Sequence, residues 1–202
     1  MPIPILAFLL ALIAVAATPA RAQVTDEAQL ARAFVNAKKN VPILVAPGEY
    51  DIPEIQIRRN ATLIGEGEVV FFSSRPVAKG LLNPVDTGSL HVENITFSGA
   101  VSPDLNGAGI RHDGEDLTVV NCRFVGNENG ILSTGSDFGR IRIERSTFSG
   151  NGHGDGYSHG VYVLRAESVE VRNSRFEGTK IGHHLKLLAR RVLVADSEFD
   201  DS

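Results

Sequence analysis

The sequence repeats one pattern of apolar and polar positions five times. Each unit ends in a phenylalanine, with apolar residues seven and five positions before it and a small or apolar residue two positions before it. Apolar residues at alternate positions are typical of strands that bury one face. The units are 90–97, 117–124, 141–148, 169–176 and 192–199, and their phenylalanines lie 23 to 28 residues apart. This spacing is typical of a solenoid.

The alternation slips by one residue inside every unit, three positions before the phenylalanine. The residues at this position are Asn94, Asn121, Arg145, Asn173 and Asp196. Asparagine and aspartate tolerate a left-handed backbone and form hydrogen bonds with neighbouring backbone groups. We therefore predict a strand, a one-residue bend and a short strand in each unit. Bend residues and phenylalanines should then stack in columns along the solenoid axis.

A turn, a loop of variable length and a third short apolar run follow each of the first four units. These runs lie at 109–111, 130–132, 160–163 and 184–187. Three strands per turn indicate an all-β, single-stranded parallel β-helix whose coils hydrogen-bond to the coils above and below. An antiparallel sandwich is the alternative, but it favours tight two-residue hairpins and fixes no residue in every unit.

Residues 1–22 have the pattern of a cleavable export signal. Residues 5–17 are almost wholly apolar but too few to span a bilayer, and Ala20-Arg21-Ala22 has the form of a cleavage site. The first four residues contain no lysine or arginine, so an uncleaved anchor is the alternative. Cleavage would leave a periplasmic or secreted protein that starts at Gln23 and has no membrane span.

The next region, 23–40, is predicted to be an N-terminal capping helix, and 41–202 the β-helix. Thr25 or Asp26 can cap a helix over 27–38. Its apolar stripe would cover the open end of the solenoid, and it contains Leu30, Ala33, Phe34 and Ala37. No capping element follows the last unit, so we expect a C-terminal truncation, the alternative being that Asp200 and Asp201 blunt the end.

Charge and cysteine content narrow the classes of partner. The chain has 20 basic and 24 acidic residues, a formal net charge of −4, which does not favour nucleic acid as the partner. The single cysteine, Cys122, has no partner for an internal disulfide and occupies an apolar repeat position. A monomer is expected.

Several of these features together resemble the pectin lyase-like superfamily of right-handed β-helix proteins. They are the capping helix, the Pro-Gly-Glu-Tyr turn at 47–50, the Leu-Ile-Gly-Glu-Gly segment at 63–67 and the asparagine ladder. Residues 158–164 and 182–191 are also similar to segments of bacterial β-helix proteins, although Gly160 and His184 replace asparagines of that pattern. The superfamily includes lyases, hydrolases, epimerases, esterases and non-catalytic adhesins, so the resemblance specifies fold more than activity.

The resemblance implies a polysaccharide site on the outer face of the third strands. The richest polar segment there is 152–163, followed one coil later by 182–186. Stacking of 161–163 on 185–187 should bring Tyr162 beside Lys186 and His159 beside His183. Arg111 should lie two coils earlier on the same sheet, about 10 Å away.

These residue types suit β-elimination of a uronate, which needs a base, an acid and a group that neutralises the carboxylate. We assign Lys186 or His159 as base, Tyr162 as acid and Arg111 as neutraliser. His183, His184 and Tyr157 are predicted to bind the substrate. The sequence thus indicates an exported lyase or epimerase acting on uronate-containing polysaccharide. A non-catalytic glycan-binding or surface structural module, or an inactive fragment, remains the alternative.

A metal site is a further hypothesis at the loop 150–159. His153 and Asp155, with His159, offer nitrogen and oxygen ligands for a divalent ion, and Ca²⁺ is the candidate cofactor. The glycines of this loop match neither a dinucleotide-binding nor a calcium-binding repeat, and they are better suited to a projecting loop.

Overall fold

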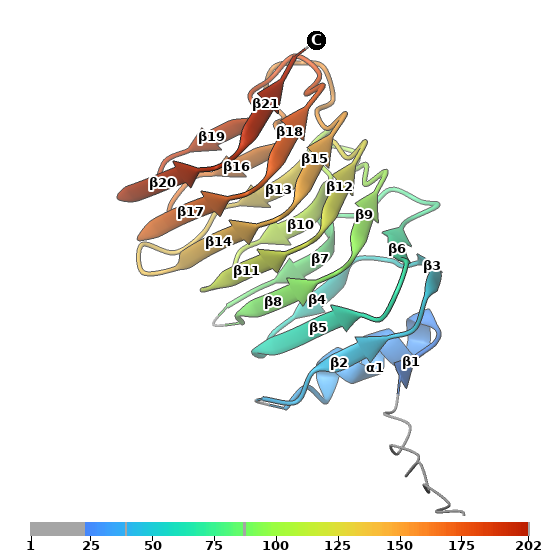
Figure 1. Cartoon of the computed structure of the whole chain (residues 1–202). Coiled ribbons are helices and arrows are strands. Elements are labelled where there is room, and N and C mark those ends of the chain that lie inside the picture. Colours follow the sequence, from blue (N-terminus) through green and yellow to red (C-terminus); the bar gives the residue numbers. More distant parts are fainter. Residues whose placement is uncertain (1–22, 39, 87, 202) are drawn as a thin grey trace, which may run out of the picture.

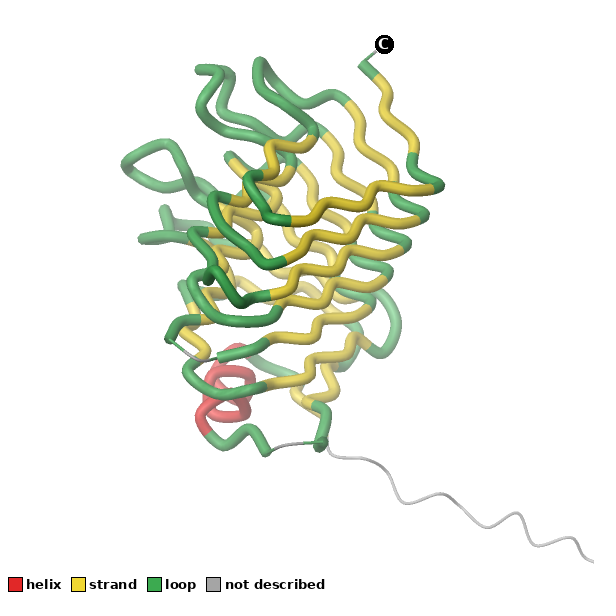
Figure 2. Tube along the Cα trace, turned by 90° about the vertical axis from the view of Figure 1, so that its left-hand side faces the viewer, coloured by secondary structure: helices red, strands yellow, loops and turns green. Residues whose placement is uncertain are grey.

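The computed structural model describes residues 23–38, 40–86 and 88–201, and the predicted export signal, 1–22, lies outside the described residues. These described residues fold into a three-sided stack of parallel coils with one short helix at the N-terminal end of the stack (Figure 1). Figure 2 shows the strands stacked along one axis, with the helix at the opposite end from the C-terminus. The predicted parallel β-helix is confirmed.

Three parallel sheets form the sides of the stack. Sheet A contains β1 (Gln23–Val24), β2 (Ile43–Val45), β5 (Ala61–Gly65), β8 (Leu90–Glu93), β11 (Leu117–Val120), β14 (Arg140–Glu144), β17 (Ser168–Arg172) and β20 (Arg191–Ala195). Sheet B contains β3 (Gly48–Asp51), β6 (Val69–Phe72), β9 (Thr96–Ser98), β12 (Arg123–Val125), β15 (Thr147–Ser149), β18 (Arg175–Glu177) and β21 (Glu198–Asp200). Sheet C contains β4 (Ile55–Ile57), β7 (Gly80–Pro84), β10 (Ala108–His112), β13 (Asn129–Ser133), β16 (Val161–Val163) and β19 (Leu185–Leu187).

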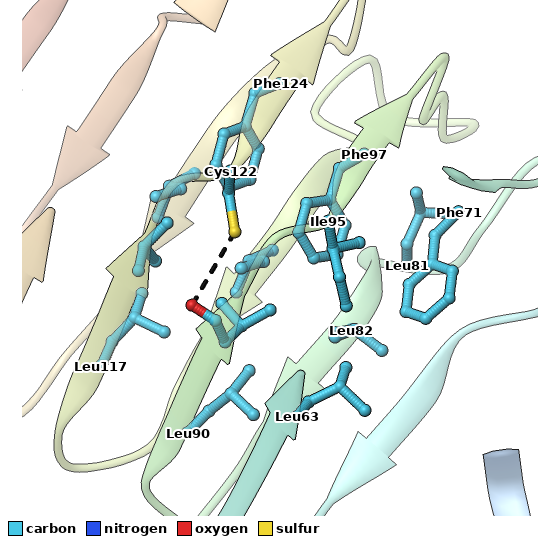
Figure 3. Close-up of a cluster of buried hydrophobic side chains, with 14 of the residues drawn as sticks. Leu63, Phe71, Leu81, Leu82, Leu90, Ile95, Phe97, Leu117, Cys122 and Phe124 are labelled. Carbon is cyan, nitrogen blue, oxygen red and sulfur yellow. Dashed lines mark hydrogen bonds between the residues drawn. The ribbon is translucent and has the colours of Figure 1, made fainter. Parts of the chain in front are cut away.

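The phenylalanines of the repeat form the predicted column inside the stack. Neighbouring rings along the column have centroids 4.6 to 5.1 Å apart and lie within 12° of parallel. Phe71 extends the column edge-on at 5.8 Å from Phe97 (Figure 3). Tyr50 continues the column beyond Phe71, with ring centroids 5.6 Å apart. The stacked residues are Phe97, Phe124, Phe148, Phe176 and Phe199.

The bends between sheets A and B also match the prediction. All five bend residues have positive φ, between 49° and 59°. Arg145 adopts this conformation as well as the asparagines do, which shows that the coil geometry imposes it.

A second column follows the bends, one residue further along each coil. Ser146 accepts the Cys122 N–H through its hydroxyl oxygen, and Ser174 does the same for the Ser146 N–H. Cys122 itself is buried, and burial raises the pKa of its thiol to about 12, so it is an unreactive core residue (Figure 3).

Helix α1 (Glu27–Val35) covers the N-terminal end of the stack. Asp26 is its N-cap and accepts the Gln29 N–H at 2.7 Å, while Leu30 and Phe34 are buried against the first coil. The helix ends three residues before the predicted Lys38, because Asn36 donates its side-chain amide to the Arg32 carbonyl and stops it. No helix of the described residues is long and apolar enough to span a bilayer.

Candidate functional site

Tyr162 and Lys186 meet on the outer face of sheet C as expected. They are directly paired in the register of β16 and β19, and both side chains are half-buried. The Lys186 ammonium lies 4.3 Å from the centroid of the Tyr162 ring, a cation–π contact. This contact fixes a positive charge at a defined point on the outer face.

Arg111 lies in the same outward column but does not reach Tyr162. Leu132 pairs with both residues and stands between them. The Arg111 side chain is only 12% exposed, and its Nε lies 2.8 Å from Asp113. The carboxylate therefore already balances much of the charge assigned to neutralising a uronate.

His159 differs from the expectation of an outward catalytic group, because it is fully buried. Its backbone N–H donates to Asn129 Oδ1, and its Nδ1 accepts the backbone N–H of His183 at 3.1 Å. The imidazole proton is therefore on Nε2, which has no hydrogen-bond partner among the described residues. Its ring packs edge-on against Tyr162, with centroids 5.0 Å apart.

The protonation of His159 follows from this environment. Burial is the largest cause, and the positive charges of Lys186 and His183 add to it, lowering the His159 pKa to about 4. The ring is neutral at neutral pH and joins one coil to the next. This histidine cannot contact a glycan in the described conformation.

The three predicted substrate-binding residues have different environments. His183 is exposed, with its ring centroid 5.1 Å from that of His159. Tyr157 is 81% exposed on the loop beside it. The His184 side chain is only 11% exposed and packs against the last two phenylalanine rings, so its burial argues for a structural role.

The loop before His159 is held by its own hydrogen bonds. Asp155 Oδ1 accepts the Tyr157 N–H at 2.9 Å, and this hydrogen bond is the largest cause that lowers the pKa of the Asp155 carboxyl. His153 Nδ1 lies 3.6 Å from the Glu128 carboxylate. Among residues 23–38, 40–86 and 88–201, no group of three or more His, Cys, Asp or Glu side chains is arranged to hold a metal ion.

Three buried polar residues near this loop were not predicted. Glu128 accepts the backbone N–H groups of Ser102 and Gly107 at 2.9 and 2.6 Å and so holds the loop of an earlier coil. Asn127 and Asn151 form a hydrogen-bonded ladder. Each asparagine follows its phenylalanine by three positions, and this repeated spacing was the available signal.

The surface hollows over the bends lie away from these residues. Two shallow depressions of about 560 and 570 Å³ follow the outer side of the bend from sheet A to sheet B. Asn94 and Arg123 line the first, and Arg145 and Arg175 line the second. They lack exposed aromatic rings, which makes sheet C the better candidate for binding a sugar.

A family model described as a right-handed beta helix region matches residues 82–201, more than half of the chain. The chain belongs to this right-handed β-helix family. The match covers the coils from β7 to β21, which carry Tyr162 and Lys186. No curated protein and no solved structure matches the chain significantly. The family establishes the fold, while the activity of this right-handed β-helix protein has to be argued from its surface.

Proposed function

We propose that this right-handed β-helix protein is exported and binds an acidic polysaccharide on the outer face of sheet C. The observation that carries the proposal is the Lys186 ammonium held 4.3 Å above the Tyr162 ring, in register on neighbouring strands. A cation fixed in this way is pre-organised to pair with the carboxylate of a uronate.

The neighbouring exposed groups suit the rest of a sugar ring. The Tyr157 ring is 81% exposed and offers an apolar face with a polar tip, which is suited to stacking on a sugar. The exposed His183 adds a polar group beside the buried His159. Coils are spaced about 4.8 Å apart, roughly the length of one sugar ring, so a linear glycan along the axis would meet equivalent positions on successive coils.

The positions of the four groups assigned to β-elimination support glycan binding better than they support catalysis. His159 is buried with its Nδ1 already accepting a hydrogen bond, so it is not available as a base. Arg111 is paired with Asp113 and separated from Tyr162 by Leu132. The four groups therefore do not surround one reacting atom.

The test is calorimetric titration of the protein with oligomers of galacturonate and of alginate. The variant Lys186→Gln removes the fixed charge, and we expect it to weaken binding about tenfold, which corresponds to ~1.4 kcal/mol. Arg142→Gln is the matched control, because Arg142 is an exposed cation on the outer face of sheet A. Equal affinities for Lys186→Gln and the unaltered protein would reject the site.

A second candidate function, β-elimination, is favoured by the direct pairing of a phenol and an amine, Tyr162 and Lys186. Incubation with the same uronates, with and without Ca²⁺, would show unsaturated product by its ultraviolet absorbance. Product that disappears in both Tyr162→Phe and Lys186→Gln would establish a lyase. Binding without product would leave the non-catalytic function.

Export is tested separately by the N-terminus of the secreted protein. Cleavage after Ala22 predicts a chain that starts at Gln23 in the extracytoplasmic fraction. An intact Met1 on membrane-bound protein would indicate an uncleaved anchor.

A further inference from the structure

The Tyr162 ring is held in place by a buried histidine. The rings of Tyr162 and His159 lie nearly perpendicular, at 88°, with centroids 5.0 Å apart. The Lys186 ammonium lies over the same Tyr162 ring, 4.3 Å from its centroid. A half-buried tyrosine on a sheet would otherwise be able to change rotamer. The packed imidazole therefore limits where the ring, and with it the ammonium, can lie.

His159 is itself fixed by the coils on either side of it. Its backbone N–H donates to Asn129 Oδ1 in the preceding coil, and its Nδ1 accepts the His183 N–H from the following coil. Gly182 permits this approach, because a Cβ at position 182 would lie 2.3 Å from the Ser158 carbonyl oxygen and 3.2 Å from His159 Nδ1. The imidazole therefore has one defined orientation, which a group that positions others requires.

The same imidazole contacts both halves of the glycan site. It packs against Tyr162 through its ring, and it accepts the His183 N–H through Nδ1. We propose that His159 is a positioning residue of the glycan site, whose ring sets Tyr162 and Lys186 and whose Nδ1 sets His183. This role rests on the proposed binding of an acidic polysaccharide to sheet C. His159 is fully buried, so it acts through its neighbours and does not touch the ligand.

Two columns of side chains change together along sheet C. The first contains Asn129, His159 and His183, and the second, three residues later in each coil, contains Leu132, Tyr162 and Lys186. Asn129 already supplies the acceptor that its position needs, since its Oδ1 accepts the His159 N–H. The asparagine stands in the coil of Leu132, and the imidazole stands in the coil of Tyr162. The ring of His159 is therefore additional to the hydrogen bond, and Tyr162 is the side chain against which it packs.

Two substitutions separate the two contacts of His159. His159→Asn keeps a side-chain acceptor for the His183 N–H and removes the ring, whereas His159→Phe keeps a ring beside Tyr162 and removes the acceptor. Nuclear magnetic resonance of the glycan-free protein reads both contacts. The ring current of Tyr162 shifts the Lys186 Hε protons upfield, and exchange of the His183 N–H reports its hydrogen bond.

We expect His159→Asn to reduce the upfield shift of the Lys186 protons by about half or more and to leave exchange at His183 slow. His159→Phe should do the reverse, with the Lys186 shift retained and the His183 N–H exchanging about tenfold faster. Calorimetric titration with galacturonate oligomers should show several-fold weaker binding for both variants. Each variant decides its own contact if the other reduces folding.

His112→Gln is the matched control. His112 is also a fully buried histidine of sheet C, on β10, and a glutamine there can still donate to the Glu115 carbonyl. This variant should leave the Lys186 shift, the His183 exchange and the binding unchanged.

An unchanged Lys186 shift in His159→Asn, unchanged His183 exchange in His159→Phe, or equal losses in His112→Gln would overturn the proposal. A lack of glycan binding by the unaltered protein would instead remove the proposed function. The two magnetic resonance measurements would then still decide whether His159 positions these side chains.

Discussion

The sequence around His159 does not show whether this residue belongs to a surface site or to the buried structure. It lies among glycines and polar residues, a setting typical of a surface site, yet its ring accepts the His183 N–H inside the protein. Asn129, one coil earlier in the same column, accepts the His159 N–H in the same way. The column therefore needs a hydrogen-bond acceptor, and an imidazole supplies it only while Nδ1 is unprotonated.

This requirement predicts a pH dependence of stability. The His159 pKa is about 4 in the folded protein and near 6.5 when unfolded, so the unfolded state binds the extra proton between these values. The free energy of unfolding should fall as pH decreases from 6.5 to 4, with His159 contributing ~1–3 kcal/mol of the loss.

The variant His159→Asn isolates this contribution, because it keeps an acceptor and removes the titrating group. Denaturant unfolding at pH 7 and pH 4.5 should show a smaller difference for His159→Asn than for the unaltered protein. His112, whose pKa is also lowered by burial, is present in both proteins and cancels in the comparison. Equal pH slopes would contradict the burial of His159.

Each strand and bend occupies the same position relative to the phenylalanine of its coil. Within the phenylalanine column, the burial of a ring depends on whether rings lie on both sides of it. Phe124 stacks between two other rings and is fully buried, while Phe199 has a ring on one side and is 46% exposed. Truncation of a buried aromatic side chain removes its apolar burial and leaves a cavity.

We therefore predict that Phe124→Ala costs ~3–5 kcal/mol of unfolding free energy and that Phe199→Ala costs less than half as much. Urea denaturation followed by far-ultraviolet circular dichroism measures both. Similar costs for the two variants would contradict the exposure of Phe199 at the end of the column.

Strands and bends were predictable because they repeat, and the contacts between loops were not. The five bend residues share one position relative to phenylalanine, so their left-handed backbone could be inferred even for Arg145. Glu128 forms its hydrogen bonds with Ser102 and Gly107, on a loop whose length differs from coil to coil. Such contacts depend on loop path, which no periodic pattern specifies.

In the candidate site, the pairing of strands was predictable and the burial of side chains was not. The pairing of Tyr162 with Lys186 followed from aligning two apolar runs, and the register confirms it. The burial of His159 and His184 did not follow, because polar residues next to glycine looked like surface loop. Only the aromatic rings and backbone groups of adjacent coils explain why these two histidines face inward.

The whole molecule repeats one arrangement of strands in every coil, and its three outer faces differ in chemistry. Sheet A carries Arg–Glu pairs such as Arg142–Glu144, and sheet B carries a similar cluster around Arg175. These charges already have partners, so they offer little net attraction to a uronate. On sheet C the Lys186 ammonium contacts an aromatic ring rather than a carboxylate, which leaves its charge available.

Hydrogen–deuterium exchange with a saturating acidic oligosaccharide reports which face of the protein binds the glycan. Binding on the outer face of sheet C predicts slower exchange in β16, β19 and the loop 152–158, and no change on sheets A and B. Protection along the bend between sheets A and B, or none anywhere in the chain, would contradict it.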